Sequence, residues 1–227
     1  YPMFLAVYDG DYDKLLLKTG RQVAKSTTIA CFMLADSIGQ SHFKTYYVSP
    51  SQEQTRKFSH TRIAKIMSYS PDVRKNFLGP ESIDNVYLRL LRNGSEMAFT
   101  YALDDPDRAR GYSADRCAFD EIQDILYEPV VPVIEECMSN SQHGARSVYC
   151  GTPKTMENTI EFLWSLSSQT EWCVRCEGCG KSTFIDSQKA LGLRGPECLS
   201  CHKPLNVRKG RWVDMKADAP IKGFHIP

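Results

Sequence analysis

Short apolar runs alternate along this chain with longer segments in which apolar residues recur every three or four positions. Consecutive apolar residues predict buried strands, and the three-to-four periodicity predicts amphipathic helices. We expect strands at residues 15–18, 45–48, 116–119 and 147–150 and helices at residues 26–38, 52–68 and 130–139. This alternation is typical of an α/β fold with a mainly parallel sheet flanked by helices on both faces.

Two turn signals refine this pattern. Asn93-Gly94 lies between apolar segments at residues 85–91 and 96–102 and predicts a β-hairpin. Pro132 predicts that the helix over residues 130–139 has its first turn there, because proline fits the start of a helix. In such a sheet the ligand is expected at the carboxyl ends of the strands.

The stretch KTGRQVAKST, which joins the first strand to the first helix, has phosphate-binding chemistry. Lys25 would reach the β- and γ-phosphates, and the Ser26 hydroxyl would hold Mg²⁺. The stretch departs from G-x-x-x-x-G-K-[ST] because Thr19 and Ala24 replace the two glycines. The alternative is an ordinary strand–turn–helix with a surface lysine. The nucleotide contacts are expected from Gly20, Arg21, Gln22, Val23, Ala24, Lys25, Ser26 and Thr27.

An acidic pair follows a second apolar strand, 94 positions beyond Ser26. Asp120 and Glu121 come at the end of the run over residues 116–119. A phosphate-loop enzyme needs a carboxylate that holds Mg²⁺, for which Asp120 is suited, and a group that activates water, for which Glu121 is suited. An Asp-Glu pair alone is usually a solvated turn. Its position after an apolar strand favours the catalytic interpretation.

A third apolar run, over residues 147–150, ends in Gly151-Thr152-Pro153. In RecA-like ATPases the strand next to the acidic one often ends in a small hydroxyl residue that senses the γ-phosphate, and Thr152 has this position. The alternative is plain turn chemistry before Pro153. The order of the three segments predicts a P-loop NTPase sheet of the RecA (ASCE) type.

Two C-x-x-C pairs lie in the last quarter of the chain, with 18 residues between them. Four thiolates at this spacing can close a tetrahedral Zn²⁺ site, which would be structural because no position is left open. Disulfides fit poorly with a chain that shows no export signal. Cys173 and His202 are spare donors that could replace a ligand. The expected zinc ligands are Cys176, Cys179, Cys198 and Cys201.

Length and charge divide the chain into unequal parts. Its 227 residues suggest one large domain and a small module. Residues 171–212 have a net charge of +4, and the remainder has −3. We expect an ATPase domain at 1–170, a zinc ribbon at 171–212 and a linker at 213–227. No apolar run is long enough for a transmembrane helix.

Several segments together resemble a known family, the large terminase subunit of tailed bacteriophages. Five of them lie in the family's order, and those in the ATPase part cover about residues 15–165. A zinc ribbon followed by Gly-x-Trp and a Gly-Phe-His-Ile-like stretch is similar to that of some members. The segments that carry the resemblance are residues 20–26, 49–54, 110–115, 119–125, 150–153, 210–212 and 223–227.

The resemblance implies an ATP-hydrolysing motor that translocates double-stranded DNA into the procapsid. It implies that Arg21 contacts the γ-phosphate region and couples hydrolysis to movement, that Glu121 activates water, and that Thr152 relays the nucleotide state. An arginine that acts in trans would be Arg108 or Arg110; Arg21 would act in cis. Ala24 stands where glycine is commoner in the family.

The resemblance also implies partners: a portal protein, a small terminase subunit and further copies in a ring, in the cytoplasm of the infected host cell and away from membranes. Whether the chain alone is a monomer is left open. A nuclease domain would follow residues 213–227, and its acidic cluster is expected outside this sequence. The alternatives are a superfamily-2-type helicase or translocase core and a catalytically dead nucleotide fold that binds DNA or protein.

Overall fold

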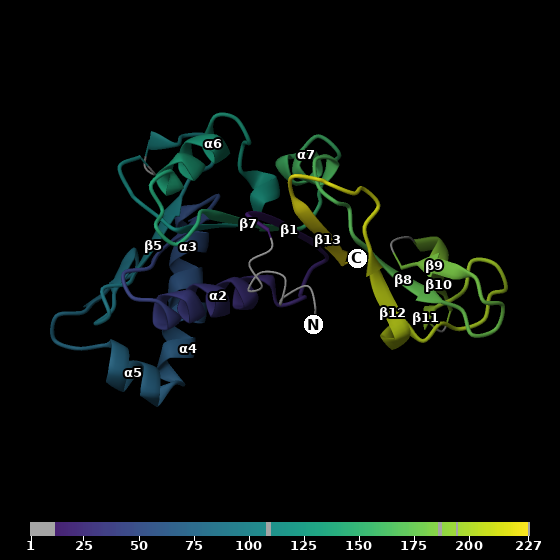
Figure 1. Cartoon of the computed structure of the whole chain (residues 1–227), viewed down its shortest axis with the longest axis horizontal. Helices are drawn as coiled ribbons and strands as arrows, with labels where there is room; N and C mark the ends of the chain where they lie inside the picture. The colour runs from purple at the N-terminus through teal and green to yellow at the C-terminus, as the bar shows by residue number, and fades with distance from the viewer. Residues whose placement is uncertain (1–11, 108–109, 186–187, 194, 227) are drawn as a thin grey trace.

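One twisted, eight-stranded sheet organises the chain in the computed structural model, which describes residues 12–107, 110–185, 188–193 and 195–226 (Figure 1). The strand order is β13-β1-β7-β6-β2-β5-β4-β3, and the first six of these strands are parallel to their neighbours. The strands are β1 (Lys14–Thr19), β2 (Lys44–Ser49), β3 (Ile83–Asp84), β4 (Leu88–Leu90), β5 (Glu96–Tyr101), β6 (Arg116–Asp120), β7 (Arg146–Gly151) and β13 (Lys222–Ile226).

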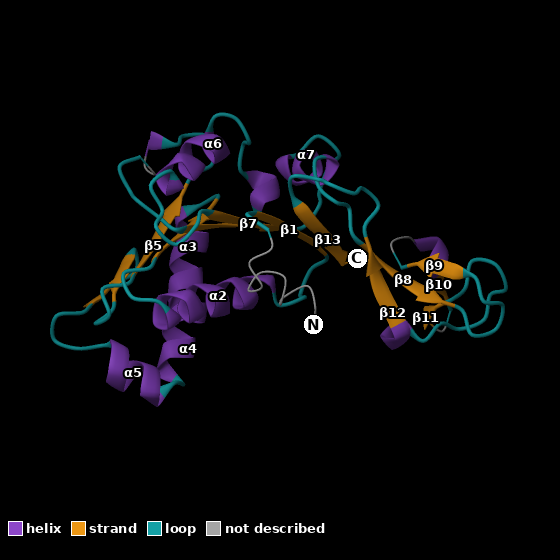
Figure 2. Ribbon diagram, in the orientation of Figure 1, coloured by secondary structure: helices purple, strands orange, loops and turns teal. Residues whose placement is uncertain are grey.

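Helices cover both faces of this sheet (Figure 2). One face carries α2 (Lys25–Gly39), α3 (Gln52–Phe58), the π-helical segment η1 (Ser59–Ala64), α4 (Lys65–Ser68) and α5 (Pro71–Phe77). The other face carries the 3-10 turn η3 (Ile122–Asp124), α6 (Val130–Glu135), the 3-10 turn η4 (Glu136–Met138) and α7 (Thr159–Ser165).

The strands build two cores because successive side chains point to opposite faces. Leu15 and Leu17 belong to the core beneath α2, with Phe32 among its residues. Leu16 belongs to the other core, which includes Phe119. A continuous apolar run is therefore what a strand buried on both sides requires. The predicted α/β class with a mainly parallel sheet is confirmed.

Two predicted helices differ in detail from the structure. The helix expected over residues 52–68 is interrupted by η1, where Arg89 Nη2 donates to the Ser59 carbonyl oxygen at 3.2 Å; a side chain that takes a backbone carbonyl widens the turn. The helix expected to start at Pro132 instead begins at Val130. Pro132 still lies in the first turn, where a missing N–H breaks no intrahelical bond.

The hairpin around Asn93-Gly94 is confirmed. Strands β4 and β5 are antiparallel, and Gly94 has φ +77°, a conformation that favours glycine.

The structure corrects the expectation that residues 213–227 form only a linker. Residues Lys222–Ile226 are strand β13 at the edge of the main sheet, in parallel register with β1. The Gly20 N–H donates to the Ile226 carbonyl oxygen at 2.7 Å, so this strand also holds the entrance of the phosphate-loop segment. A strand formed by the last residues is invisible to local patterns because its partner is about 200 positions away in the sequence.

The last quarter of the chain forms a small module beside β13 (Figure 1). Its aromatic side chains connect it to the main sheet: Trp172 and Trp212 have centroids 5.0 Å apart, and Trp212 and Phe224 have centroids 5.2 Å apart. The elements of the module are β8 (Glu171–Arg175), β9 (Ser182–Phe184), η5 (Gln188–Ala190), β10 (Leu191–Gly192), β11 (Gly195–Pro196), η6 (Val207–Lys209) and β12 (Gly210–Val213).

Candidate functional site

The parallel register brings the predicted site residues to one edge of the sheet. Strand β7 lies between β1 and β6, so the phosphate-loop segment, Thr152 and the acidic pair follow three adjacent strands. Asp120 is level with Cys150, and Gly151 is level with Lys18. Side chains that are far apart in sequence therefore meet at the carboxyl ends, where α/β sheets bind ligands.

The segment between β1 and α2 has two residues in the left-handed region. Gln22 has φ 63°, and Ala24, the N-cap of α2, has φ 62° and ψ 24°. An L-residue is about 1–2 kcal/mol less stable in this conformation than in the right-handed one, a penalty that glycine escapes. Ala24 therefore adopts the backbone that the usual glycine of this position would adopt freely.

Ala24→Gly is expected to stabilise the protein. Relief of the left-handed strain, less the extra flexibility of glycine in the unfolded chain, amounts to about 0.5–1 kcal/mol, or a rise of roughly 1–3 °C in Tm. Thermal unfolding of both variants measures this. Ala35→Gly, at an exposed position inside the same helix, is the matched control and should lower Tm. A fall in Tm for Ala24→Gly would contradict the expectation.

Ser26 and Asp120 lie in direct contact. The Ser26 hydroxyl donates to Asp120 Oδ2 at 2.8 Å, and the Tyr47 hydroxyl donates to the same oxygen at 3.1 Å. Burial is the main cause that raises the pKa of Asp120 above its ordinary value, opposed chiefly by the hydrogen bond from Ser26. A hydroxyl and a carboxylate are the hard oxygen donors that Mg²⁺ takes, and a divalent cation would stabilise the charged carboxylate.

Lys25 and Glu121 face each other beside this pair. Lys25 Nζ lies 3.8 Å from Glu121 Oε1 and donates a hydrogen bond to the Thr152 hydroxyl. The Lys25 side chain is 10% exposed and that of Glu121 is 33% exposed. Glu121 has φ 53°, and a non-glycine residue held in this region is typical of functional sites. The structure therefore brings Lys25, Glu121 and Thr152 together.

These residues line a cleft of about 470 Å³, a size suited to a nucleotide. Arg21 is exposed at its wall, and residues 22–27 complete that side. Sequence reasoning missed the roles of four further lining residues, of which Gln54 and Gln123 lie in segments that carry the family resemblance. Arg62, in the π-helical η1, also lines an adjoining hollow of about 260 Å³ beside Asp120. The four are Gln54, Arg62, Gln123 and Lys154.

The two arginines predicted to act in trans are outside this cleft. Arg108 lies outside the described residues. Arg110 Nε pairs with Asp107 Oδ1 at 3.0 Å, and the Arg110 side chain is 64% exposed. Its position on the surface is open to another molecule, and its role stays a prediction.

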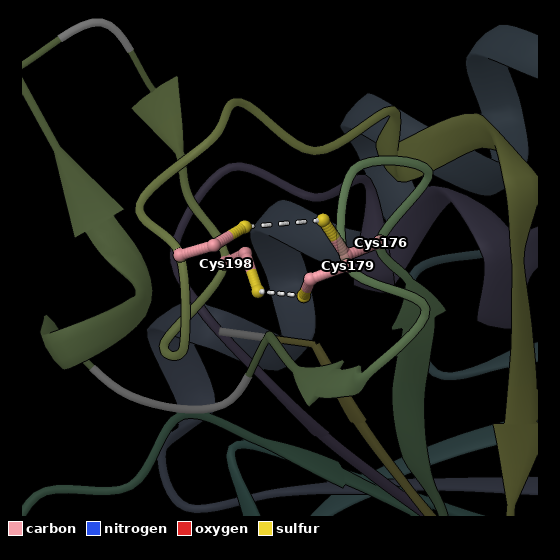
Figure 3. Close-up of side chains that lie close together, drawn as sticks. Cys176, Cys179 and Cys198 are labelled. Atoms are coloured by element: carbon pink, nitrogen blue, oxygen red, sulfur yellow. Dashed lines mark hydrogen bonds between the residues drawn. The ribbon is translucent and has the colours of Figure 1, made fainter.

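Four cysteine sulfurs converge in the small module (Figure 3). All four sulfurs lie within 4.8 Å of one another, and the pairs Cys176–Cys201 and Cys179–Cys198 are each 3.6 Å apart. A tetrahedral zinc site with bonds of about 2.3 Å places its sulfurs about 3.8 Å apart, so the donor set and spacing fit Zn²⁺. Cys173 does not join this group and lies in β8.

Backbone amides support the sulfur cluster. The N–H of Gly178 donates to the Cys176 sulfur at 3.3 Å, and the N–H of Ser200 donates to the Cys198 sulfur at 3.4 Å. Backbone donation from Ser200 and Cys201 lowers the pKa of the Cys198 thiol to about 6. Metal ligation requires thiolates, which these amides stabilise.

Comparison with known proteins adds the family. The model of the phage terminase large subunit gpA ATPase domain matches residues 3–194. No curated protein sequence matches. Among solved structures, the large terminase ATPase domain of Thermus phage P74-26 aligns with a TM-score of 0.59 and 14% identity, over 99% of this chain and 79% of that one.

Two longer terminase structures share the fold. The large terminase of bacteriophage HK97 aligns with a TM-score of 0.59 and 17% identity, over 71% of this chain and 34% of that one. The large terminase of another thermophilic bacteriophage aligns with a TM-score of 0.57 and 12% identity, over 72% of this chain and 41% of that one. At these identities the likeness establishes the fold.

Proposed function

Since the chain belongs to the phage terminase large subunit gpA family, as the ATPase domain of a DNA-packaging motor, we propose that its 470 Å³ cleft binds ATP with Mg²⁺ and hydrolyses it. The observation that carries this is the contact of Ser26 with Asp120 at 2.8 Å beside Lys25 and Glu121. A cation ligand pair, a phosphate-binding ammonium group and a base lie within one cleft.

Each side chain has a proposed role in phosphoryl transfer. Lys25 and the amides at the start of α2 bind the phosphates, and Ser26 with Asp120 would hold Mg²⁺, which neutralises charge on the phosphate oxygens when bound. Glu121 accepts the proton of the attacking water. Arg21, exposed at the wall of the cleft, stabilises the charge that develops at the γ-phosphate. Thr152, bonded to Lys25, relays the nucleotide state.

Zn²⁺ is the metal we propose for the cysteine cluster. Four sulfurs close a tetrahedral site and leave no position for a substrate, so the metal would order the module rather than take part in hydrolysis. The stacked aromatic residues against β13 support a bracing role for this module. Residues 171–212 as a zinc ribbon therefore stay a proposal, together with the domain boundary at 170.

The partners follow from the packaging role. We propose double-stranded DNA as the translocated polymer, with a ring of copies, a portal protein and a small terminase subunit as the assembly, and a nuclease domain elsewhere in the whole protein. The host-cell cytoplasm is the proposed location. No helix in the described part of the chain is long and apolar enough to cross a membrane.

Ser26→Ala tests the proposed cleft. Loss of a cation ligand should weaken Mg²⁺-dependent ATP binding by about tenfold while binding without Mg²⁺ changes little. Calorimetric titration with and without Mg²⁺ measures both. The matched control is Ser37→Ala in the same helix: the Ser37 hydroxyl is buried without a hydrogen-bond partner among the described residues, so its removal should leave ATP affinity unchanged. Equal affinities for parent and Ser26→Ala in Mg²⁺ would overturn the assignment.

A further inference from the structure

One buried amide connects the acidic strand to the neighbouring strand. Gln123 Nε2 donates to Glu121 Oε2 at 2.6 Å, and the Thr152 N–H donates to Gln123 Oε1 at 3.1 Å. The Gln123 residue is 6% exposed. Both ends of its amide are therefore used, and each end serves a residue from a different strand end, β6 for Glu121 and β7 for Thr152.

The chain makes room for this amide at Gly151. A Cβ at that position would lie 2.2 Å from Gln123 Oε1, and the next nearest atoms, from Ile160 and Ile122, would lie 3.1 and 3.2 Å away. Gly151 has no positive φ, so the close approach is what requires glycine there. Packing on all sides holds the amide in one orientation.

The contacts form a closed ring at the cleft. Glu121 contacts Gln123, Gln123 contacts Thr152, Thr152 contacts Lys25, and Lys25 Nζ lies 3.8 Å from Glu121. When Lys25 turns to a phosphate, its two contacts in the ring are given up. The Gln123 amide then remains as the connection between Glu121 and Thr152.

We infer that Gln123 is a positioning residue for hydrolysis: its amide orients the Glu121 carboxylate and transmits movement at Thr152 to it. The inference rests on the proposed function, in which Glu121 activates water. Gln123 does not contact the nucleotide phosphates in this role. Its removal should therefore affect the chemical step and spare ATP binding.

Gln123→Met tests this inference, since it keeps the length of the side chain and removes both hydrogen bonds. We expect kcat for ATP to fall by about 10- to 100-fold, as for a misplaced catalytic group, and KM to stay within about twofold. Gln52→Met is the matched control: it also loses one side-chain hydrogen bond, from Gln52 Nε2 to the Tyr87 hydroxyl at 2.8 Å, but outside the cleft, and kcat should not change.

A double-mutant cycle separates positioning from a structural effect. If Gln123 acts through Glu121, Gln123→Met will lower kcat no further in a Glu121→Gln background. An additional loss of the same size in that background would overturn the inference, as would an unchanged kcat in Gln123→Met.

Gly151→Ala supplies an independent variant should Gln123→Met unfold below the assay temperature. Its added methyl group displaces the amide while Glu121, Gln123 and Thr152 keep their side chains, so kcat should fall with little change in KM. A parent-like kcat in Gly151→Ala would overturn the inference. Hydrolysis that survives Glu121→Gln defeats the proposed function itself, whereas loss in Glu121→Gln with parent-like Gln123→Met defeats the inference alone.

Discussion

Glu121→Gln will leave ATP binding nearly unchanged and lower kcat by about 10²–10⁴-fold, since a positioned general base contributes that much to a proton transfer. The amide is isosteric with the carboxylate and can still contact Gln123, so the cleft should keep its shape. Lys25, 3.8 Å from the carboxylate, remains free to bind phosphate. Phosphate release gives kcat, and titration calorimetry gives the affinity for ATP.

Glu81→Gln is the control for this charge change, because Glu81 is exposed and does not line the cleft. It should hydrolyse ATP as the parent does. Equal kcat values for parent and Glu121→Gln would end the assignment of Glu121 as the base. They would favour the catalytically dead nucleotide fold if both values were at background. A large loss in Glu121→Gln alone excludes that alternative.

Removal of zinc will unfold the small module. Binding free energies of about 10–16 kcal/mol are typical of structural zinc sites, and this energy is folding energy for a segment with little core of its own. Cys198→Ser should lose about one zinc per chain and lower Tm by roughly 10 °C or more, because the module also packs against β13 through Trp212 and Phe224. Metal analysis, thermal unfolding and limited proteolysis between residues 176 and 205 measure these effects.

Two other cysteines serve as controls. Cys31→Ser, at an exposed position of α2, should keep the zinc and the Tm. Cys173→Ala should keep the zinc as well, since its sulfur is outside the cluster. Zinc that persists in Cys198→Ser but is lost in Cys173→Ala would show that Cys173 is a ligand and that the cluster has another arrangement in solution.

Much of the site could be predicted because its chemistry is local. Lys25 and Ser26 follow a buried strand and open a helix, and Asp120 with Glu121 follows another; both patterns span fewer than a dozen residues. The cysteine pairs are equally local, and their spacing limits which donors can meet. The structure then brings these segments together with the contacts that parallel strands impose.

Other parts of the site depend on contacts that no local pattern encodes. Arg62 lines the cleft because η1 has a π-helical turn beside Arg89, which is 27 positions further along the chain. The link from Gln123 to Thr152 depends on β7 lying next to β6 and on the space left by Gly151. Each requires the register of the sheet to be known first.

The sequence by itself therefore determined the α/β class, the phosphate-loop segment, the acidic pair and the cysteine quartet, since each follows from residue types at short spacing. Only the tertiary structure decided that the final residues form an edge strand beside β1, where they receive the Gly20 N–H, and that Gln123 joins two strand ends. The physical reason is that strand pairing and the packing of a buried amide are long-range contacts, selected by the energy of the whole sheet and its two cores.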